Sequence, residues 1–233
     1  MSINRDQQET VRQIGFFEEL RLQRWDDHRY YHHSRVNQSL HLLSSTCFIT
    51  MYALLLIDPS AAALLGWLLA MCSRQIGHFF FKPTSYDRVN AATNEHKEEI
   101  KIGYNLVRKR MLLSIWGLSP LLLLVHPGAF GLFKPAAGWQ DFLFNVSMLW
   151  FGLGIAAVLF RTVQLFYIRG VQTGLVWATK ILTDPFNDFR QYLKSPWYLL
   201  YGELIDPMLE VQLEMQLGEN GIEADEGPLV LTN

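Results

Sequence analysis

Four long apolar runs, separated by polar segments, dominate the pattern of the chain. They cover residues 40–57, 61–81, 111–133 and 142–159, and Arg74 is the one Lys, Arg, Asp or Glu within them. Crossing the hydrocarbon core of a bilayer takes about 20 predominantly apolar residues. The runs therefore predict four transmembrane helices and an all-α integral membrane bundle. A soluble all-α core is the alternative, but the runs mostly lack the polar stripe of a soluble helix.

The first two runs are joined by Asp58, Pro59 and Ser60 alone, a short helix-breaking turn. This turn predicts an antiparallel hairpin. His41 at the start of the first run and His78 near the end of the second then lie at the same membrane face. The third run also starts from that face, so the connecting segment 82–110 returns to it.

Basic residues give the orientation, because Lys and Arg in short loops stay on the cytoplasmic side. With four spans the far side holds only Lys134, so nineteen of the twenty Lys and Arg lie at the histidine face. We expect a bacterial inner membrane or endoplasmic reticulum location, with the histidines at the cytoplasmic face. The net charge of −2 gives no indication of a nucleic-acid partner, and the expected partner is the lipid bilayer. The oligomeric state stays open.

The polar segments predict three regions. Residues 1–170 form the four-helix transmembrane domain, 171–217 a cytoplasmic or interfacial helical tail, and 218–233 an acidic, disordered tail. Asp-Pro and Ser-Pro pairs divide the middle region, and Thr183 or Asp184 before Pro185 predicts a helix start. This region is interpreted either as a lid over the ends of the spans or as an interfacial anchor.

Histidines gather just before the first apolar run. The stretch HRYYHHSRVNQSLH, residues 28–41, holds four of the seven in the chain, as either a solvated lip or a metal site. His32 and His41 are nine residues apart, on opposite faces of a straight helix, but they could converge if the chain breaks near Ser34–Asn37 and restarts at a cap. With His78 they would place three imidazoles at one membrane face, and imidazole suits iron, zinc, copper and nickel.

Other polar residues extend this candidate site. Arg74 and Gln75 lie within one helical turn of His78, and polar groups at membrane depth usually face the bundle interior. His96 and Glu99 are spaced i, i+3, which lets one helix offer two metal ligands. Alternatively, Arg74 reaches the interface and the glutamates belong to a solvated helix face.

The pattern His32-x4-Asn37-x3-His41 leads into the hairpin, and Gln75-Ile76-Gly77-His78 closes it. This combination resembles the 2-hydroxy-fatty-acid dioxygenases, small helical membrane proteins with non-haem iron. The resemblance covers about residues 30–81. It implies an Fe²⁺ enzyme that uses O2 to remove one carbon from a 2-hydroxy fatty acid.

The resemblance also implies roles for single residues. His32, His41 and His78 become iron ligands with His96 as the candidate fourth, and Asn37 becomes a capping residue or a support for the ligands. Two further assignments come from chemistry: Arg74 would bind the substrate carboxylate, and Gln75 would orient an imidazole. Zinc, a di-iron hydroxylase or desaturase, and a non-enzymatic membrane scaffold or lipid-binding subunit remain alternatives.

Overall fold

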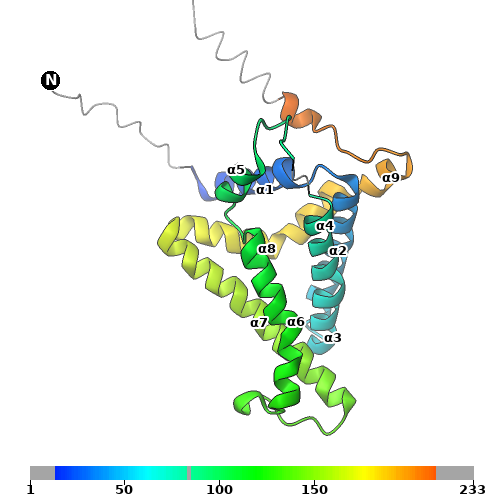
Figure 1. Cartoon of the computed structure of the whole chain (residues 1–233), viewed down its shortest axis with the longest axis vertical. Helices are drawn as coiled ribbons and strands as arrows, with labels where there is room; N and C mark the ends of the chain where they lie inside the picture. Colours follow the sequence, from blue (N-terminus) through cyan, green and yellow to red (C-terminus); the bar gives the residue numbers. More distant parts are fainter. Residues whose placement is uncertain (1–13, 83–84, 214–233) are drawn as a thin grey trace, which may run out of the picture.

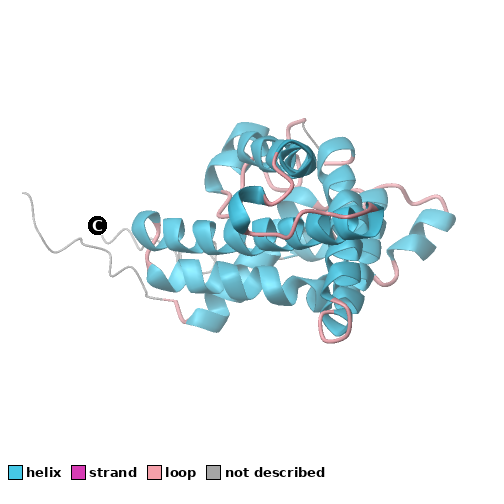
Figure 2. Ribbon diagram, turned by 90° about the horizontal axis from the view of Figure 1, so that it is seen from below, coloured by secondary structure: helices cyan, strands magenta, loops and turns pink. Residues whose placement is uncertain are grey.

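The computed structural model describes residues 14–82 and 85–213, and every regular element within them is a helix. Figure 2 shows helices and loops in the described part of the chain. The extended pairing there is limited to two isolated bridges, Ser34 with Ile205 and Asp87 with Ala92. The predicted all-α class is therefore confirmed.

The first two apolar runs form the predicted hairpin. Helix α2 (Arg35–Leu54) is followed by α3 (Pro59–Leu64), the π-helical segment η1 (Leu65–Met71) and α4 (Cys72–Phe80). The Asp58 carboxylate starts the return, because it accepts hydrogen bonds from the backbone N–H groups of Ser60 and Ala61, each at 3.0 Å. Pro59 occupies the first helical turn, where its missing N–H costs nothing. α4 consequently packs beside α2 (Figure 1).

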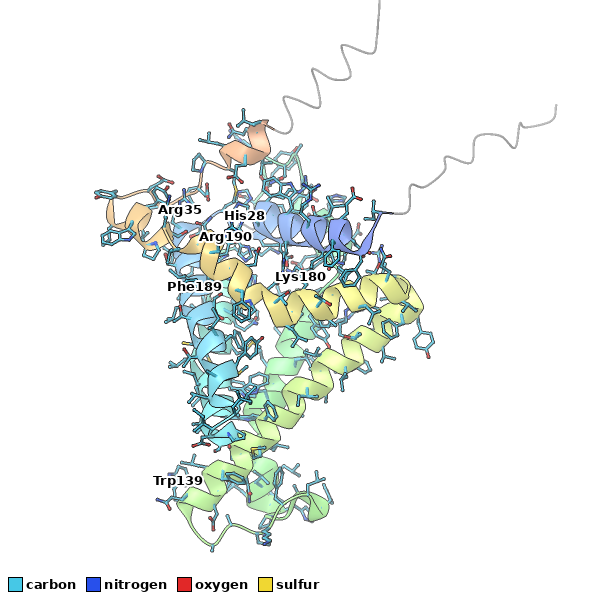
Figure 3. The ribbon with its side chains drawn as sticks, turned by 180° about the vertical axis from the view of Figure 1, so that it is seen from behind. His28, Arg35, Trp139, Lys180, Phe189 and Arg190 are labelled. Atoms are coloured by element: carbon cyan, nitrogen blue, oxygen red, sulfur yellow. The ribbon has the colours of Figure 1, made fainter. Side chains whose placement is uncertain are left out.

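The third and fourth runs form α6 (Leu106–Val125) and α7 (Trp139–Ile168), which are joined through the short 3-10 turn η2 (Ala129–Gly131). Three indoles connect them to the hairpin. Trp67 stacks on Trp116 with ring centroids 5.3 Å apart, and Trp150 donates to the Trp116 carbonyl at 3.2 Å. In Figure 3, Trp139 at the start of α7 lies at the end of the molecule opposite His28 and Arg35.

Helix α8 (Val171–Tyr192) crosses the histidine end of the hairpin and lies beneath α1 (Phe16–Tyr31) in Figure 1. The chain reverses between α7 and α8 at Gly170, whose φ of 97° favours glycine. The predicted helix start before Pro185 is wrong, because α8 continues through this proline. A proline removes only one backbone hydrogen bond, and packing of α8 against α1, α2 and α7 compensates for it.

Residues 171–213 pack against the helices that precede them. α8 packs against α1, α2 and α7, and α9 (Ser195–Leu200) packs against α2. The described part of the chain is thus one packed unit. The predicted acidic tail, residues 218–233, lies outside the described residues.

By length and composition, α7 is the one helix of residues 14–82 and 85–213 that could cross a membrane. The other three apolar runs also became helices. However, α6 begins with Arg108, Lys109 and Arg110, and the return helix of the hairpin is interrupted by the π-helical η1. The structure therefore shows helices where four spans were expected, but a four-span bundle is not confirmed.

Candidate metal centre

Three histidines from three separate segments converge where α1, α2 and α4 meet. His32 follows the last residue of α1, His41 lies on α2, and His78 lies on α4. One ring nitrogen of each lies within 4.8 Å of the others. The Nε2 atoms of His32 and His41 are 3.2 Å apart, and the His41 and His78 ring centroids are 4.8 Å apart. The predicted convergence of these three imidazoles is present.

The convergence depends on the break between α1 and α2, which falls at residues 32–34, slightly before most of the predicted range 34–37. Ser34 caps α2 by accepting from the Asn37 N–H at 3.4 Å, and the Asn37 amide donates to the Tyr31 carbonyl at 2.8 Å. Asn37 is fully buried against Gly77 of α4, where an added Cβ would lie 2.2 Å from its Oδ1 atom. Asn37 thus ends α1 at the correct point, and Gly77 lets α4 approach.

Two residues of α8 contact the histidines on the side away from the cluster. The Nδ1 atom of His41 faces an Asp188 carboxylate oxygen at 3.3 Å, and Arg74 donates to the same oxygen at 2.8 Å. The Tyr192 hydroxyl lies 3.0 Å from the Nδ1 atom of His32 and 3.2 Å from that of His28. Carboxylate and hydroxyl partners of this kind orient metal-binding imidazoles.

These contacts decide which ring nitrogens carry protons. The Asp188 carboxylate requires a proton on Nδ1 of His41, which leaves its Nε2 lone pair free to bind a cation. Burial raises the pKa of Tyr192 well above its usual value, and nearby Asp188 raises it further, so its hydroxyl keeps one proton to donate. Burial lowers the pKa of His28 to about 4, so His28 is neutral and can accept that proton in a hydrogen bond.

When the Tyr192 proton is directed at His28, His32 donates from Nδ1 to the Tyr192 oxygen. Burial, together with His41, lowers the pKa of His32 well below its usual value, so a proton on both nitrogens is disfavoured. The Nε2 lone pairs of His32 and His41 then point at one another. In this arrangement a cation would be bound between the two nitrogens, whereas with the Tyr192 proton directed at His32 the Nε2–H group of His32 donates to Nε2 of His41.

The residues present fit a metal ion. Nitrogens that are each about 2.1 Å from a tetrahedral metal lie about 3.4 Å apart, close to the 3.2 Å between the Nε2 atoms of His32 and His41. The Nδ1 atom of His78 is buried and has no hydrogen-bond partner in the described part of the chain. An unpaired buried nitrogen is costly, and a metal ion would satisfy it.

A balanced network of charges surrounds the cluster on the α8 side. Arg24 contacts Asp184 at 3.2 Å, Lys180 contacts Asp184 at 3.2 Å, and Lys180 also contacts Asp27. Burial raises the pKa of Asp184 and Asp188 above the usual range, which the neighbouring Lys180 and Arg74 oppose. In Figure 3, Lys180 lies on the side of α8 that faces α1. With Arg74 and Asp188 the network has three cations and three carboxylates.

One small cavity adjoins the cluster, and a larger one lies beside it. A cavity of about 10 Å³, enough for roughly one water, is bounded by His32, Asp188 and Tyr192 among others. A more open cavity of about 340 Å³ lies between α1 and α8 and shares Arg24, Asn187 and Gln191 with the smaller one. The cluster therefore has a polar approach between these two helices.

The remaining predicted site residues have other positions. Arg74, expected to bind a substrate carboxylate, binds Asp188 instead, and Gln75 donates to Met71 Sδ at 3.3 Å without a hydrogen bond to the histidines. His96 and Glu99 are exposed on α5 (Asn94–Ile100) and are not part of the cluster.

The orientation of α5 has a physical cause. The neighbouring Lys97 is fully buried and binds Asp87 at 2.7 Å, and the Tyr31 hydroxyl donates to the Lys97 carbonyl at 2.5 Å. These contacts turn Lys97 inward, and His96 and Glu99 consequently face outward. The spacing of His96 and Glu99 was compatible with metal binding, but it could not show which side of α5 packs against α1.

Sequence reasoning missed Asp188 and Tyr192. The signal was present, because Lys180, Asp184, Asp188 and Tyr192 recur every four residues and form one polar stripe on α8. Dividing this helix at Pro185 concealed the stripe.

Comparison of the chain with protein-family models, with curated proteins and with solved structures gives no match.

Proposed function

We propose that this protein is a membrane-embedded, non-haem iron-dependent oxygenase that acts on a fatty-acyl lipid. A 2-hydroxy-fatty-acid dioxygenase is the specific activity proposed. The observation that carries the proposal is the convergence of His32, His41 and His78 from three segments, with ring nitrogens within 4.8 Å of one another. The resemblance of residues 30–81 to that family supports the choice of iron and of a lipid substrate.

Exposed apolar side chains support the placement in a membrane. On α6, Leu118 is 61% exposed and Leu124 64%, and on α7 Leu159 is 59% exposed. Contiguous apolar surface of this kind is rare on soluble monomers and typical of lipid-facing helices. In the proposed placement α2, the helix of residues 59–80, α6 and α7 are the four spans, with the histidine cluster at the cytoplasmic face.

The roles of the residues follow from their contacts. His32, His41 and His78 would hold the iron, and Asp188 and Tyr192 would orient two of these imidazoles. Three protein ligands leave positions on the metal for other molecules. An iron ion held there would supply redox chemistry with O2.

Binding of the lipid would use both the hydrocarbon around the spans and the polar surroundings of the histidines. The acyl chain would lie in hydrocarbon between the spans, with its polar head beside the histidines. Arg74 is occupied by Asp188, so the basic residues 108–110 at the start of α6 are the better candidates for a carboxylate.

Metal analysis of the full chain in detergent tests the proposal. We expect about one iron per chain, lost in both His41→Ala and His78→Ala. His126→Ala is the matched control, because this exposed histidine follows α6 and stacks on Phe130. Oxygen consumption should then depend on an added 2-hydroxy fatty acid. Full metal retention in both histidine variants would exclude this centre.

The same measurement separates the alternatives. Two irons per chain would favour a di-iron hydroxylase or desaturase, and stoichiometric zinc would favour hydrolytic chemistry. A wild-type chain that binds no metal would favour a membrane scaffold or lipid-binding subunit.

A further inference from the structure

A short segment near the end of the described chain crosses the break between α1 and α2. We call residues 203–206 the strap. The Arg35 N–H donates to the Leu204 carbonyl at 2.9 Å, and the Asp206 N–H donates to the His33 carbonyl at 2.7 Å. Ser34 and Ile205 form an antiparallel bridge between these two bonds. The strap thus pairs with His33, Ser34 and Arg35, the three residues that directly follow His32.

Side chains reinforce this pairing. The Arg35 guanidinium donates to Glu203 at 2.9 Å through Nε and to Asp206 at 2.8 Å through Nη1. The Arg35 side chain is 11% exposed and that of Asp206 is 16%, so water competes weakly for this ion pair. Arg35 lies at the same end of the molecule as His28 in Figure 3.

The Gln38 amide connects the strap to His32. Its Nε2 group donates to the His32 carbonyl at 2.8 Å and to Asp206 at 2.7 Å. Its Oε1 atom accepts from Ser195 at 2.6 Å and from Arg35 at 2.9 Å. Both donors and both acceptor positions of this buried amide are therefore used, and no other rotamer could repeat the pattern.

His32 needs such support more than the other two histidines. His41 and His78 lie inside helices, whereas His32 is in the break, with φ −118° and ψ 39°. A ligand outside regular structure is held only by the contacts of its own backbone and ring. Gln38 and Asn37 hold the backbone on either side of His32, and Tyr192 contacts its ring.

We propose that the strap and Gln38 are positioning elements that hold His32 in the histidine cluster. The role of His32 as a ligand rests on the proposed function, but the position of its ring does not. Removal of the strap should therefore release His32 while His41 and His78 stay in place. Metal bound afterwards would have two imidazole ligands instead of three.

Chemical labelling of the metal-free protein tests the positioning directly. Full-length chain, a chain ending at Leu213, a chain ending at Tyr201, and Gln38→Glu would be treated with diethylpyrocarbonate in detergent, and each histidine followed by mass spectrometry. The chain ending at Leu213 is the control, because it retains every contact described above. Gln38→Glu keeps the strap but replaces the donor to His32 with a carboxylate, which also repels Asp206.

We expect His32 to react about tenfold faster or more in both variants. Gln38→Glu loses the donor to the His32 carbonyl, and the chain ending at Tyr201 loses the hydrogen bonds of the strap to His33, Arg35 and Gln38, which hold the backbone next to His32. His41 should stay protected in both. A peptide of residues 202–213, added to the shorter chain, should restore the protection of His32. An unchanged His32 rate in both variants would overturn the proposal, as would equal acceleration of His32 and His41.

Copper loading gives a second readout, since the nitrogen couplings of bound Cu²⁺ count its imidazoles. Three in the full chain and two in the chain ending at Tyr201 is the expected result, and three in both would contradict it. If the full chain binds no metal, the proposed function fails, and the labelling still decides the role of the strap. If metal binds and the labelling of His32 is unchanged, the positioning role of the strap is refuted and the proposed function is not.

Discussion

Replacement of Asp188 by Asn should weaken metal binding without removing a ligand. The carboxylate accepts from Nδ1 of His41 at 3.3 Å, and the two side chains are 8% and 0% exposed, so water cannot replace the lost charge. Loss of a comparable partner of a metal-binding imidazole typically costs about 10- to 100-fold in affinity. This corresponds to about 1.4–2.7 kcal/mol of binding free energy.

Asp184→Asn is the matched control for this prediction. Asp184 lies one helical turn earlier on α8 and belongs to the same charge network, but it binds Arg24 and Lys180 rather than a histidine. Both variants remove one carboxylate near the cluster. The difference between them therefore isolates the contact with His41 from the change in overall charge.

Competition of the purified protein with a chelator of known affinity, using Co²⁺ or Zn²⁺, measures the effect. Asp188→Asn should lower affinity at least tenfold more than Asp184→Asn. Equal losses in the two variants would show that the carboxylates act through charge alone. An unchanged affinity in Asp188→Asn would refute the assignment of this residue as the partner of a metal-binding imidazole.

Three further predictions concern packing, pH and α5. Gly77→Ala should lower the free energy of unfolding by about 1–3 kcal/mol and weaken metal binding, whereas Gly117→Ala, with open space around it, should have a neutral or stabilising effect in thermal melts. The pKa of His28 is about 4 in the folded chain and 6.5 in the unfolded chain. The unfolded chain therefore takes up the proton first, and the free energy of unfolding falls as the pH is lowered from 6.5 to 4. Urea unfolding should show wild type losing up to about 3 kcal/mol more than His28→Asn over this range, and parallel pH profiles would contradict it. The double variant His96→Ala, Glu99→Ala should bind as much metal per chain as the wild type. A loss of metal would show that these residues contribute to the metal site.

The sequence contained the information for the hairpin and for the meeting of the histidines. Asp58 and Pro59 act locally, through a cap and a fixed φ, so the turn can be predicted without tertiary contacts. The same holds for the restart of the helix at Ser34. Once both turns are placed, His32, His41 and His78 have little freedom to lie elsewhere.

The support of the site was harder to predict, because it depends on packing between distant segments. Asp188 is separated from His41 by 147 residues, and Asp206 from Gln38 by 168. No local pattern indicates these partners. The orientation of α5 was hard to predict for the same reason, because the burial of Lys97 with Asp87 decides which side of this helix faces inward.

Helix α8 combines both environments that the proposed function requires. One stripe of its charged and hydroxyl side chains is buried, namely Lys180, Asp184, Asp188 and Tyr192, whereas Arg190 is exposed. Several of its large apolar side chains are exposed, among them Leu182 at 56% and Phe186 at 54%, whereas Trp177 is buried. A helix surrounded by water would have the opposite arrangement. Asp188 and Tyr192 of the buried stripe contact the histidine cluster, and under the proposed function the exposed apolar side chains would contact lipid. If the proposed function holds, the same helix would connect the polar site to the bilayer, as an enzyme that takes its substrate from a membrane requires.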